Sequence, residues 1–359
     1  MPLPEHLRAL AAVYADPSAA GSPLALRVRA ALPHLPFTVL DQGQSPPRDQ
    51  PGQIVHITSH KGRFLRPCPA AKRYRCCGYQ IVHTGEGCPL DCSYCILKAY
   101  LKHRTLRVFA NQETMYRDLA RRFGQDQARP FRVGTGQFAD SLALEPLTGQ
   151  ARDLVSFLGD FDNVTLELKS KVVDLTWMSA AVRPDRVLPA WSVNAPDITA
   201  GQEPGAASLP ERLAAARQCA EAGFRVCLHF DPVIYYPGWE QGYARTVEMI
   251  RDYLRPRDVA YLSLGSLRFL PELGEAISAN PLYAHGEYVG GLDGKRRLLR
   301  PLRVEQLRCL AGLLISAGFG PAIYLCMESD TVWREVLGRV PIGPDNLGRF
   351  LTARAFADG

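Results

Sequence analysis

Three cysteines are crowded into the stretch "GEGCPLDCSYCILKAY", residues 85–100. Cys88, Cys92 and Cys95 have the spacing Cys-x3-Cys-x2-Cys, with no fourth cysteine close by. Thiolates at this spacing reach a common centre only if the backbone loops around it, and the glycines and proline of the stretch favour such turns. Thiolates hold iron–sulfur clusters, usually four of them for a [4Fe-4S] cube. Three ligands therefore leave one iron open to another molecule.

A structural zinc site is a less favoured alternative for the same cysteines. Zinc needs a fourth cysteine or histidine at compact spacing, commonly in two pairs. His83 is the only nearby candidate, and it falls inside a predicted strand. A group of unrelated buried thiols is the remaining alternative.

The composition is that of an ordinary globular protein. The chain has 359 residues, of which 47% are hydrophobic and 22% charged. It contains no apolar run of about 18 residues and no apolar N-terminal signal core, so we expect a cytoplasmic protein without membrane contact. Ten cysteines are too few in this length for a disulfide scaffold.

The charge pattern permits an anionic partner. The net charge is +6, and residues 60–77 carry six basic residues and no acidic one. This segment is either a solvated loop or a phosphate-binding surface. Its basic residues are Lys61, Arg63, Arg66, Lys72, Arg73 and Arg75.

From residue 79 onward, short apolar runs alternate with longer amphipathic ones, as in repeated βα units. The best marked helix begins at Ser208, which can form a capping box with Glu211, and Gly223 provides its stop. Parallel strands need crossover helices, so six units predict an α/β fold with a partial (β/α)6 TIM-like barrel. The predicted strands are 79–84, 130–135, 163–168, 186–193, 224–230 and 259–265.

Segments outside the barrel complete the predicted organisation. Residues 1–60 are expected to form a helical extension, with helical spacing in "LRALAAVYA" and "LALRVRAALPHL" followed by a Pro-, Gly- and Gln-rich linker at 41–53. The barrel spans 61–270. Residues 271–359 are expected to form a hairpin and helices that pack on the barrel.

Polar residues follow each predicted strand. In parallel barrels, chemistry gathers at the carboxyl ends of the strands, so these residues are expected to meet at one face. Each one alone is also compatible with a loop or capping role. They are Gln137, Asp140, Lys169, Ser192, Asn194, His229, Asp231, Ser263 and Ser266, with Cys326 and Glu328 added if the last strand joins the sheet.

The cysteine motif, with aromatic Tyr94 before its last cysteine, resembles the signature of the radical S-adenosylmethionine superfamily. That resemblance implies that S-adenosylmethionine occupies the open iron of a [4Fe-4S] cluster. Reductive cleavage then gives a 5'-deoxyadenosyl radical, which abstracts a hydrogen atom from the substrate. The protein positions and shields this chemistry.

Within the superfamily, residues 60–270 resemble the spore photoproduct lyase family, whose members reverse a thymine lesion in DNA. The similar segments include "RPCPAAKRYRCCGYQIVHTGEGCPLDCSYCILKAYL", "EPGAASLPERLAAARQCAEAGF" and "PGWEQGY". The resemblance implies an electron donor such as flavodoxin or ferredoxin. It assigns the cluster to Cys88, Cys92 and Cys95 and the S-adenosylmethionine pocket to Asp140, Lys169 and Ser192, to which we add Asn194.

Two positions depart from the family pattern. Gln137 stands where the lyase has the cysteine that returns a hydrogen atom to the repaired thymine, and Ile96 stands where it has a relaying tyrosine. Another group must then quench the product radical, or the substrate differs. The candidate catalytic set is Gln137, Tyr94 and Cys77, with Cys76, Cys227 or a tyrosine as other quenchers.

The remaining cysteines leave several roles open. Cys68, Cys76 and Cys77 precede the cluster motif in the basic segment, where they would form a second metal site, a quencher or inert buried thiols. Cys219 and Cys309 fall on predicted helices and are expected to pack in the core.

A basic β-hairpin is predicted at residues 286–303, with Asp293-Gly294 as a two-residue turn. Such a hairpin suits contact with DNA phosphates and lesion extrusion, although a positively charged edge strand has the same pattern. The candidate contacts are Lys295, Arg296, Arg297 and Arg300, with Arg303 beyond them.

Three functions remain open on the sequence. The first is repair of a DNA photolesion with a substituted quencher. The second is radical modification of a small molecule, peptide or RNA. The third is a non-catalytic iron–sulfur protein that binds nucleic acid, which the matching positions Asp140, Lys169 and Ser192 disfavour.

Overall fold

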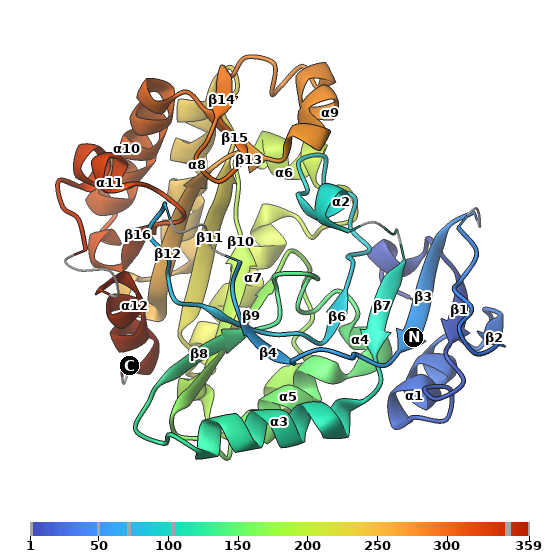
Figure 1. The fold of residues 1–359 in the computed structure, drawn as a ribbon. Coiled ribbons are helices and arrows are strands. Elements are labelled where there is room, and N and C mark those ends of the chain that lie inside the picture. The colour runs from blue at the N-terminus through green and yellow to red at the C-terminus, as the bar shows by residue number, and fades with distance from the viewer. Residues whose placement is uncertain are drawn as a thin grey trace.

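A computed structural model describes residues 3–48, 51–69, 73–101, 103, 105–341 and 346–357. Its centre is an eight-stranded sheet in the order β16-β12-β11-β10-β9-β8-β5-β4 (Figure 1). All neighbouring strands are parallel except β4, which pairs antiparallel with β5. The strands are β4 (Leu65–Pro67), β5 (Gln80–Val82), β8 (Phe131–Gly134), β9 (Val164–Ser170), β10 (Val187–Ser192), β11 (Val226–Val233), β12 (Val259–Ser266) and β16 (Ile323–Leu325).

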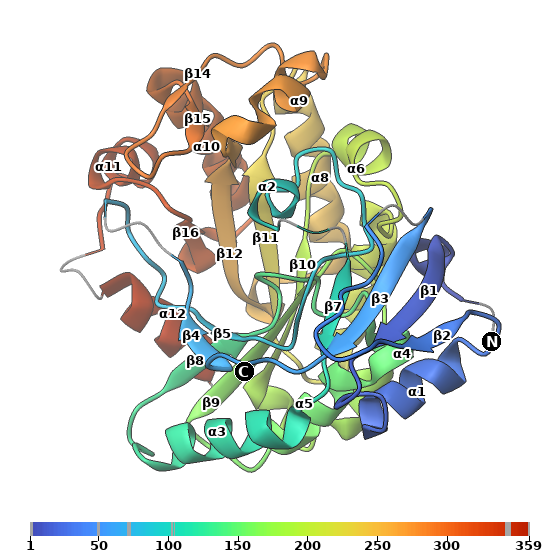
Figure 2. The ribbon, with the colours of Figure 1, turned by 45° about the vertical axis from the view of Figure 1, so that its right-hand side comes forward.

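This sheet confirms the predicted barrel strands. All six predicted runs coincide with β5 and β8 to β12, and β16 joins as a further parallel strand beyond them. Strands buried on both faces are continuous apolar runs, which is why they stand out in the sequence. The sheet curls without closing, as a partial barrel does (Figure 2).

Helices cover the outer face of the sheet and connect its strands. The capping box at Ser208 and Glu211 is present at the start of α7, and Gly223 has φ +89° just after its end. The helices are α2 (Leu97–Tyr100), α3 (Gln112–Gly124), α4 (Glu145–Thr148), α5 (Gln150–Leu158), α6 (Pro196–Gln202), α7 (Leu209–Glu221), α8 (Trp239–Tyr253), α9 (Gly274–Ala279), α10 (Arg300–Ser316), α11 (Asp330–Leu337) and α12 (Asn346–Phe356). Short 3-10 helices lie at Glu5–Leu7, Thr176–Ala180, Pro184–Arg186, Pro256–Asp258, Pro271–Leu273 and Gly320–Ala322.

A second sheet lies at the N-terminal side, turned forward in Figure 2, in the order β2-β1-β3-β7-β6. The predicted helix in "LALRVRAALPHL" is confirmed as α1 (Pro23–Ala31), but the one in "LRALAAVYA" is wrong, because residues 10–15 form a strand. A short apolar run buried on both faces has no decisive periodicity. The strands are β1 (Leu10–Ala15), β2 (Phe37–Val39), β3 (Gln53–Thr58), β6 (Gly85–Glu86) and β7 (Leu106–Phe109).

The second sheet crosses the predicted boundary at residue 60. Strands β6 and β7 come from the barrel segment, yet β7 pairs with β3 in parallel and with β6 antiparallel. The cluster motif directly follows β6. The N-terminal segment is therefore part of the framework that holds the motif, rather than a separate helical extension.

The C-terminal hairpin is present, with a wider loop than predicted. Strands β14 (Tyr288–Gly290) and β15 (Arg296–Leu298) pair antiparallel, and β13 (Arg268–Phe269) extends them to a three-stranded sheet. Gly290 pairs with Arg296, so residues 291–295 form the connection and the predicted two-residue turn is wrong. Arg300 and Arg303 lie on α10 rather than on the hairpin. Within the described residues, none of the helices is both long and apolar enough to cross a membrane.

Candidate active site

The carboxyl ends of the barrel strands open onto a cavity of about 300 Å³, here called the central cavity. It brings together residues from the cluster motif, the strand ends and the basic segment. Among its lining residues are Cys68, Cys77, Cys88, Cys92, Tyr94, Cys95, Ile96, Gln137, Asp140, Glu167, Lys169, Lys171, Ser192, His229, Asp231, Ser263, Arg268, Lys295 and Cys326.

The cluster motif forms a loop between β6 and α2, and its three cysteines all line the central cavity. Gly87 has φ +92°, and a Cβ there would lie 2.9 Å from the carbonyl oxygen of Thr105. Only glycine avoids this clash. The amide of Cys95 donates to the carbonyl of Cys92 at 3.2 Å, which curls the loop. The local backbone therefore turns as the spacing predicts.

The donor set fits an iron–sulfur cluster. Burial raises the pKa of Cys92 to about 12 and the pKa of Cys88 well above its usual value, so a bound cationic group would be needed to hold them as thiolates. Among the described residues, no three acidic, histidine or cysteine side chains are placed to share a single metal ion. Each cysteine of a cubane cluster binds a different iron, so three thiols on the wall of one cavity fit the ligands of such a cluster.

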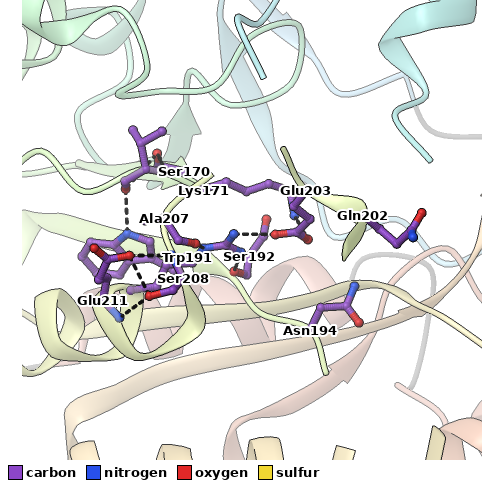
Figure 3. Close-up of polar contacts among 12 residues, drawn as sticks. Ser170, Lys171, Trp191, Ser192, Asn194, Gln202, Glu203, Ala207, Ser208 and Glu211 are labelled. Carbon is purple, nitrogen blue, oxygen red and sulfur yellow. Dashed lines mark hydrogen bonds and ion pairs between the residues drawn. The ribbon is translucent and has the colours of Figure 1, made fainter. Parts of the chain in front are cut away.

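A buried ionic network fixes the aromatic residue of the motif. Tyr94 donates its hydroxyl hydrogen to Glu203. Glu203 also accepts from Lys171 at 2.7 Å (Figure 3) and from Arg212. Burial alone would raise the pKa of Glu203, but the two cations lower it to about 2. Arg212 also donates to the backbone carbonyl of Ser192 at 2.8 Å. The network therefore ties the cluster loop to α7 and to the end of β10.

Sequence analysis missed Lys171, Glu203 and Arg212. Lys171 follows Lys169 by two residues at the same strand end, which is a usable signal. Glu203 lies in a loop, 109 residues from Tyr94 in sequence. Nothing in a single sequence indicates that pairing.

The predicted S-adenosylmethionine residues differ in how free their side chains are. Lys169 and Ser192 line the central cavity, and the ammonium of Lys169 has no hydrogen-bond or ion-pair partner in the described part of the chain. Asp140 also lines it, but one carboxylate oxygen accepts from Ser170 at 2.7 Å and the other from the amide of Lys171 at 2.7 Å. Asp140 therefore shapes the cavity wall as well as facing it.

Two predicted strand-end residues lie outside the cavity lining. Asn194 donates to the carbonyl of Pro232 at 3.0 Å and accepts from the hydroxyl of Tyr243 at 2.6 Å. Ser266 donates to Gln306 at 3.0 Å. These three bonds join buried side chains to neighbouring elements, so the structure places Asn194 outside the cavity lining and its role at the cofactor stays a prediction.

Thiols other than the cluster ligands also line the central cavity. The thiol of Cys68 donates to the side-chain oxygen of Gln137 at 3.9 Å. Burial raises the pKa of Cys68 to about 12 and the pKa of Cys326 well above the usual value. A hydrogen bond with Cys76, together with burial, raises the pKa of Cys77 well above the usual value, so all three are protonated at neutral pH. Cys227 is fully buried on β11 and absent from the cavity lining, which excludes it as a direct quencher.

The interior of the barrel is polar. His229 hydrogen-bonds Ser263 at 2.7 Å, and its other ring nitrogen lies 3.5 Å from Glu167. Tyr261 donates to Glu167 at 2.5 Å. Barrel interiors are commonly filled by branched apolar side chains, so this layer departs from a purely structural core.

Above that layer, Asp231 and Arg268 form an ion pair at 3.0 Å that faces the cavity. Arg268 also donates to the sulfur of Cys326 at 3.5 Å. Glu328, predicted to accompany Cys326, is instead fully buried and forms an ion pair with Arg303 at 3.1 Å.

The predicted nucleic-acid contacts divide into two classes. Lys295 lines the central cavity, its ammonium 5.8 Å from the ring centroid of Tyr100, and Arg296 and Arg300 are exposed. Arg297 is only 3% exposed, bonded to Asp293 at 2.7 Å. Asp293 and burial therefore cover Arg297 in this conformation, and its contact with DNA stays a prediction.

In the basic segment, Lys61, Arg63 and Arg73 are exposed, whereas Arg66 donates to His83 at 2.8 Å. Lys72 lies outside the described residues.

Comparisons with known proteins agree with this arrangement. Curated spore photoproduct lyases from Geobacillus sp. (strain Y412MC61) and Bacillus subtilis (strain 168) are 25% and 26% identical to this chain over 183 and 177 residues. The matches cover 51% and 49% of this chain and 54% and 51% of those relatives. The chain thus matches about half the length of each.

Solved structures share the fold over nearly the whole chain. A spore photoproduct lyase complexed with dinucleoside spore photoproduct has a TM-score of 0.74 at 19% identity, covering 90% of this chain and 98% of that one. A mutant of that lyase with bound AdoMet and dinucleoside spore photoproduct gives the same TM-score, identity and coverage. The sequence profile described as spore photoproduct lyase matches residues 75–269, more than half of the chain. The chain belongs to the spore photoproduct lyase family.

Proposed function

We propose that this protein is a radical S-adenosylmethionine enzyme that repairs a thymine photolesion in DNA. The observation that carries the proposal is the central cavity, which joins the three cluster cysteines to Lys169, Ser192 and a separate protonated thiol, Cys68. When bound, the [4Fe-4S] cluster and S-adenosylmethionine supply a 5'-deoxyadenosyl radical. The chain's own residues hold these groups, orient the lesion and complete the reaction.

The cofactor-binding roles follow from charge and position. Cys88, Cys92 and Cys95 would hold the cluster. Lys169 offers an unpaired ammonium to the carboxylate of S-adenosylmethionine, and Ser192 offers a hydroxyl at the end of β10. The Tyr94–Glu203–Lys171 network holds the loop that carries the cysteines. Because these groups are buried, water is kept away from the radical, which would otherwise react with solvent before it reached the substrate.

Cys68 is the proposed hydrogen-atom donor. A quencher must keep its hydrogen until the product radical forms, and the half-buried thiol of Cys68, with its pKa raised to about 12, does so. Its hydrogen bond to Gln137 places it beside the position where the family carries its donor cysteine. The S–H bond of Cys68 breaks as the C–H bond of thymine forms. The low-potential electron donor, a flavodoxin or ferredoxin, would return the thiyl radical to the thiol with one electron and one proton.

DNA is the proposed partner. Three structural neighbours are described with dinucleoside spore photoproduct. In this chain, Lys295 lines the cavity, and the exposed Arg296 and Arg300 follow it on β15 and at the start of α10. Cations placed so would neutralise phosphates on either side of an extruded lesion.

A second candidate is radical modification of a different substrate, such as a small molecule, a peptide or RNA. The charged interior made of Glu167, His229 and Asp231 favours a polar substrate, and Gln137 and Ile96 depart from the family pattern. Both candidate functions predict cleavage of S-adenosylmethionine. A non-catalytic iron–sulfur protein that binds nucleic acid would not cleave it.

The deciding experiment offers ultraviolet-irradiated DNA to the anaerobically reconstituted, reduced protein. Repair predicts loss of the spore photoproduct and recovery of thymine, together with formation of 5'-deoxyadenosine or its reuse. Unirradiated DNA is the control. Cleavage of S-adenosylmethionine without any change in the lesion would reject DNA repair and favour the second candidate.

A further inference from the structure

The ion pair between Asp231 and Arg268 occupies an unusual place in the central cavity. The two side chains are 16% and 14% exposed, and both line the cavity. They rest on the backbone of β12 at Gly265, where a Cβ would come 2.8 Å from Asp231 and 2.9 Å from Arg268. Glycine at this position is what allows the pair to lie flat against the strand.

A structural role explains this placement poorly. Removing two charges from water costs several kcal/mol per ion, and a buried ion pair adds little net stability. Asp231 lies on β11 and Arg268 on β13, and the backbone of β11 already pairs with β12 on either side of Asp231, with a register shift between Phe230 and Val233. The pair therefore has hydrogen-bonding capacity that a ligand in the cavity would use.

The chemistry of the two groups specifies what such a ligand must offer. Burial by itself would raise the pKa of Asp231, but Arg268 and Lys169 lower it below its usual value, so the carboxylate only accepts hydrogen bonds. Arg268 only donates, and the described residues accept from its two terminal nitrogens: Asp231, Cys326 and the carbonyl of Ser266. A matching ligand presents an N–H beside a carbonyl.

We propose that Asp231 and Arg268 form a recognition pair for the imide edge of a thymine in the lesion. Asp231 accepts the N3–H, and Arg268 donates to the adjacent carbonyl. A cytosine presents a bare ring nitrogen at the same position, which the carboxylate repels. This inference rests on the proposed function and adds the element that selects thymine over cytosine.

The test compares two ligands on one set of proteins. The probes are dinucleoside spore photoproduct and its analogue methylated at N3 of both thymines, titrated by calorimetry into the anaerobically reconstituted protein with S-adenosylmethionine. For the unchanged protein, N3-methylation should weaken binding roughly 10- to 100-fold, as expected for loss of a charged hydrogen bond. Asp231→Asn should weaken binding of the parent ligand by a similar factor and reduce the methylation effect to less than about threefold.

Matched controls separate recognition from folding and from cofactor binding. Asp185→Asn removes a carboxylate that Arg183 holds at 3.0 Å outside the cavity lining, and it should leave both titrations unchanged. If Asp231→Asn melts early because Arg268 is left unpaired, the double variant Asp231→Ala/Arg268→Ala removes both charges and serves in its place. S-adenosylmethionine affinity should be unchanged in these variants.

The outcomes are distinguishable. Equal binding of both ligands by the unchanged protein, or a full methylation effect in Asp231→Asn, overturns the recognition pair while leaving DNA repair standing. Loss of S-adenosylmethionine affinity in Asp231→Asn assigns the pair to the cofactor instead and also overturns it. If the unchanged protein neither binds nor repairs the lesion, the proposed function is rejected, and the recognition pair is rejected with it.

Discussion

The thiol of Cys68 donates a hydrogen bond to the side-chain oxygen of Gln137, with 3.9 Å between the two atoms. The two residues are 69 positions apart in sequence and meet at the wall of the central cavity. Gln137 has no weak X–H bond from which a hydrogen atom can be taken, but the thiol of Cys68 beside it has a weak S–H bond. Where Gln137 replaces the cysteine of the family pattern, the thiol of Cys68 thus lies next to it.

Replacing Cys68 should uncouple radical formation from repair. Cys68→Ala is expected to keep cleaving S-adenosylmethionine while its yield of repaired thymine falls roughly tenfold or more, because the product radical lacks its nearest S–H bond. In deuterated water, the thiol hydrogen of Cys68 exchanges for deuterium. The unchanged protein should therefore place deuterium in thymine, and the variant should not. Mass spectrometry of the released thymine measures both effects.

A rescue and a control make that experiment specific. Gln137→Cys added to Cys68→Ala should restore deuterium transfer, because it returns a thiol to the family position. Cys227→Ala removes a buried thiol outside the cavity lining and should change nothing in deuterium transfer. Normal, deuterium-labelled repair by Cys68→Ala would assign the donor elsewhere, with Cys77 and Cys326 as the next thiols on the wall.

Cys92 should be required for cluster assembly. Cys92→Ala leaves two of the three motif thiolates, too few for a [4Fe-4S] cluster. We expect loss of iron binding, of the visible absorption band and of S-adenosylmethionine cleavage after anaerobic reconstitution. Cys219→Ala, which removes a thiol buried on α7, should keep all three. A Cys92→Ala protein with a full iron content would contradict the assignment.

Glu203 should make the folded protein more stable at neutral pH than at acidic pH. Its pKa is about 2 in the folded protein and roughly 4.3 when unfolded. Because folding lowers this pKa, the ionised carboxylate stabilises the fold above about pH 4.3, and that contribution is lost as the pH falls toward 2. At pH 7 Glu203→Gln should lower the free energy of unfolding by roughly 3 kcal/mol, since it leaves Lys171 and Arg212 without their counter-charge.

Urea denaturation from pH 7 down to pH 3 measures that effect. The loss of stability between pH 4.3 and 3 should be shallower for Glu203→Gln than for the unchanged protein. Glu240→Gln, an exposed substitution at the start of α8, should follow the unchanged protein throughout. Parallel curves for Glu203→Gln and the unchanged protein would show that the buried network carries no net charge stabilisation.

Substitutions at the exposed and at the buried cations of the hairpin should have different effects, the first on DNA binding and the second on stability. Lys295→Ala/Arg296→Ala should weaken binding to duplex DNA and reduce the slope of log K against log salt by about 1.8, with little change in melting temperature. Arg297→Ala should instead lower the melting temperature, because Asp293 is left buried without its partner. Arg217→Ala, exposed on α7, is the control for surface charge. An unchanged salt slope in the double variant would remove the hairpin from the DNA interface.

The sequence predicts the sheet and the cysteine loop well because both signals are local. β9 and β12 are apolar runs with polar residues at their carboxyl ends, and Gly87 and Gly223 stop or turn the backbone where they stand. These features depend on neighbours a few residues away. Periodicity and turn chemistry therefore predict them without tertiary information.

What the sequence does not predict depends on partners far along the chain. β1 is a strand because β2 and β3 flank it, although its alanine-rich run also suits a helix. Arg297 and Arg296 are identical in type and adjacent, yet Asp293 and the stacked ring of Tyr74, 4.0 Å away, bury only Arg297. Likewise, Ser192 ends β10 and lines the cavity, whereas Asn194, two residues further on, is held by the carbonyl of Pro232 and the hydroxyl of Tyr243, far along the chain.

The shared sheet β2-β1-β3-β7-β6 has a practical consequence for dividing this chain. A truncated protein that begins at residue 61 would keep β7 but lose β3, exposing one long side of β7 as a template for aggregation. The loop that carries Cys88 follows β6, which depends on β7 for its pairing. Removing the first 60 residues would therefore abolish cluster assembly without touching a single cluster ligand.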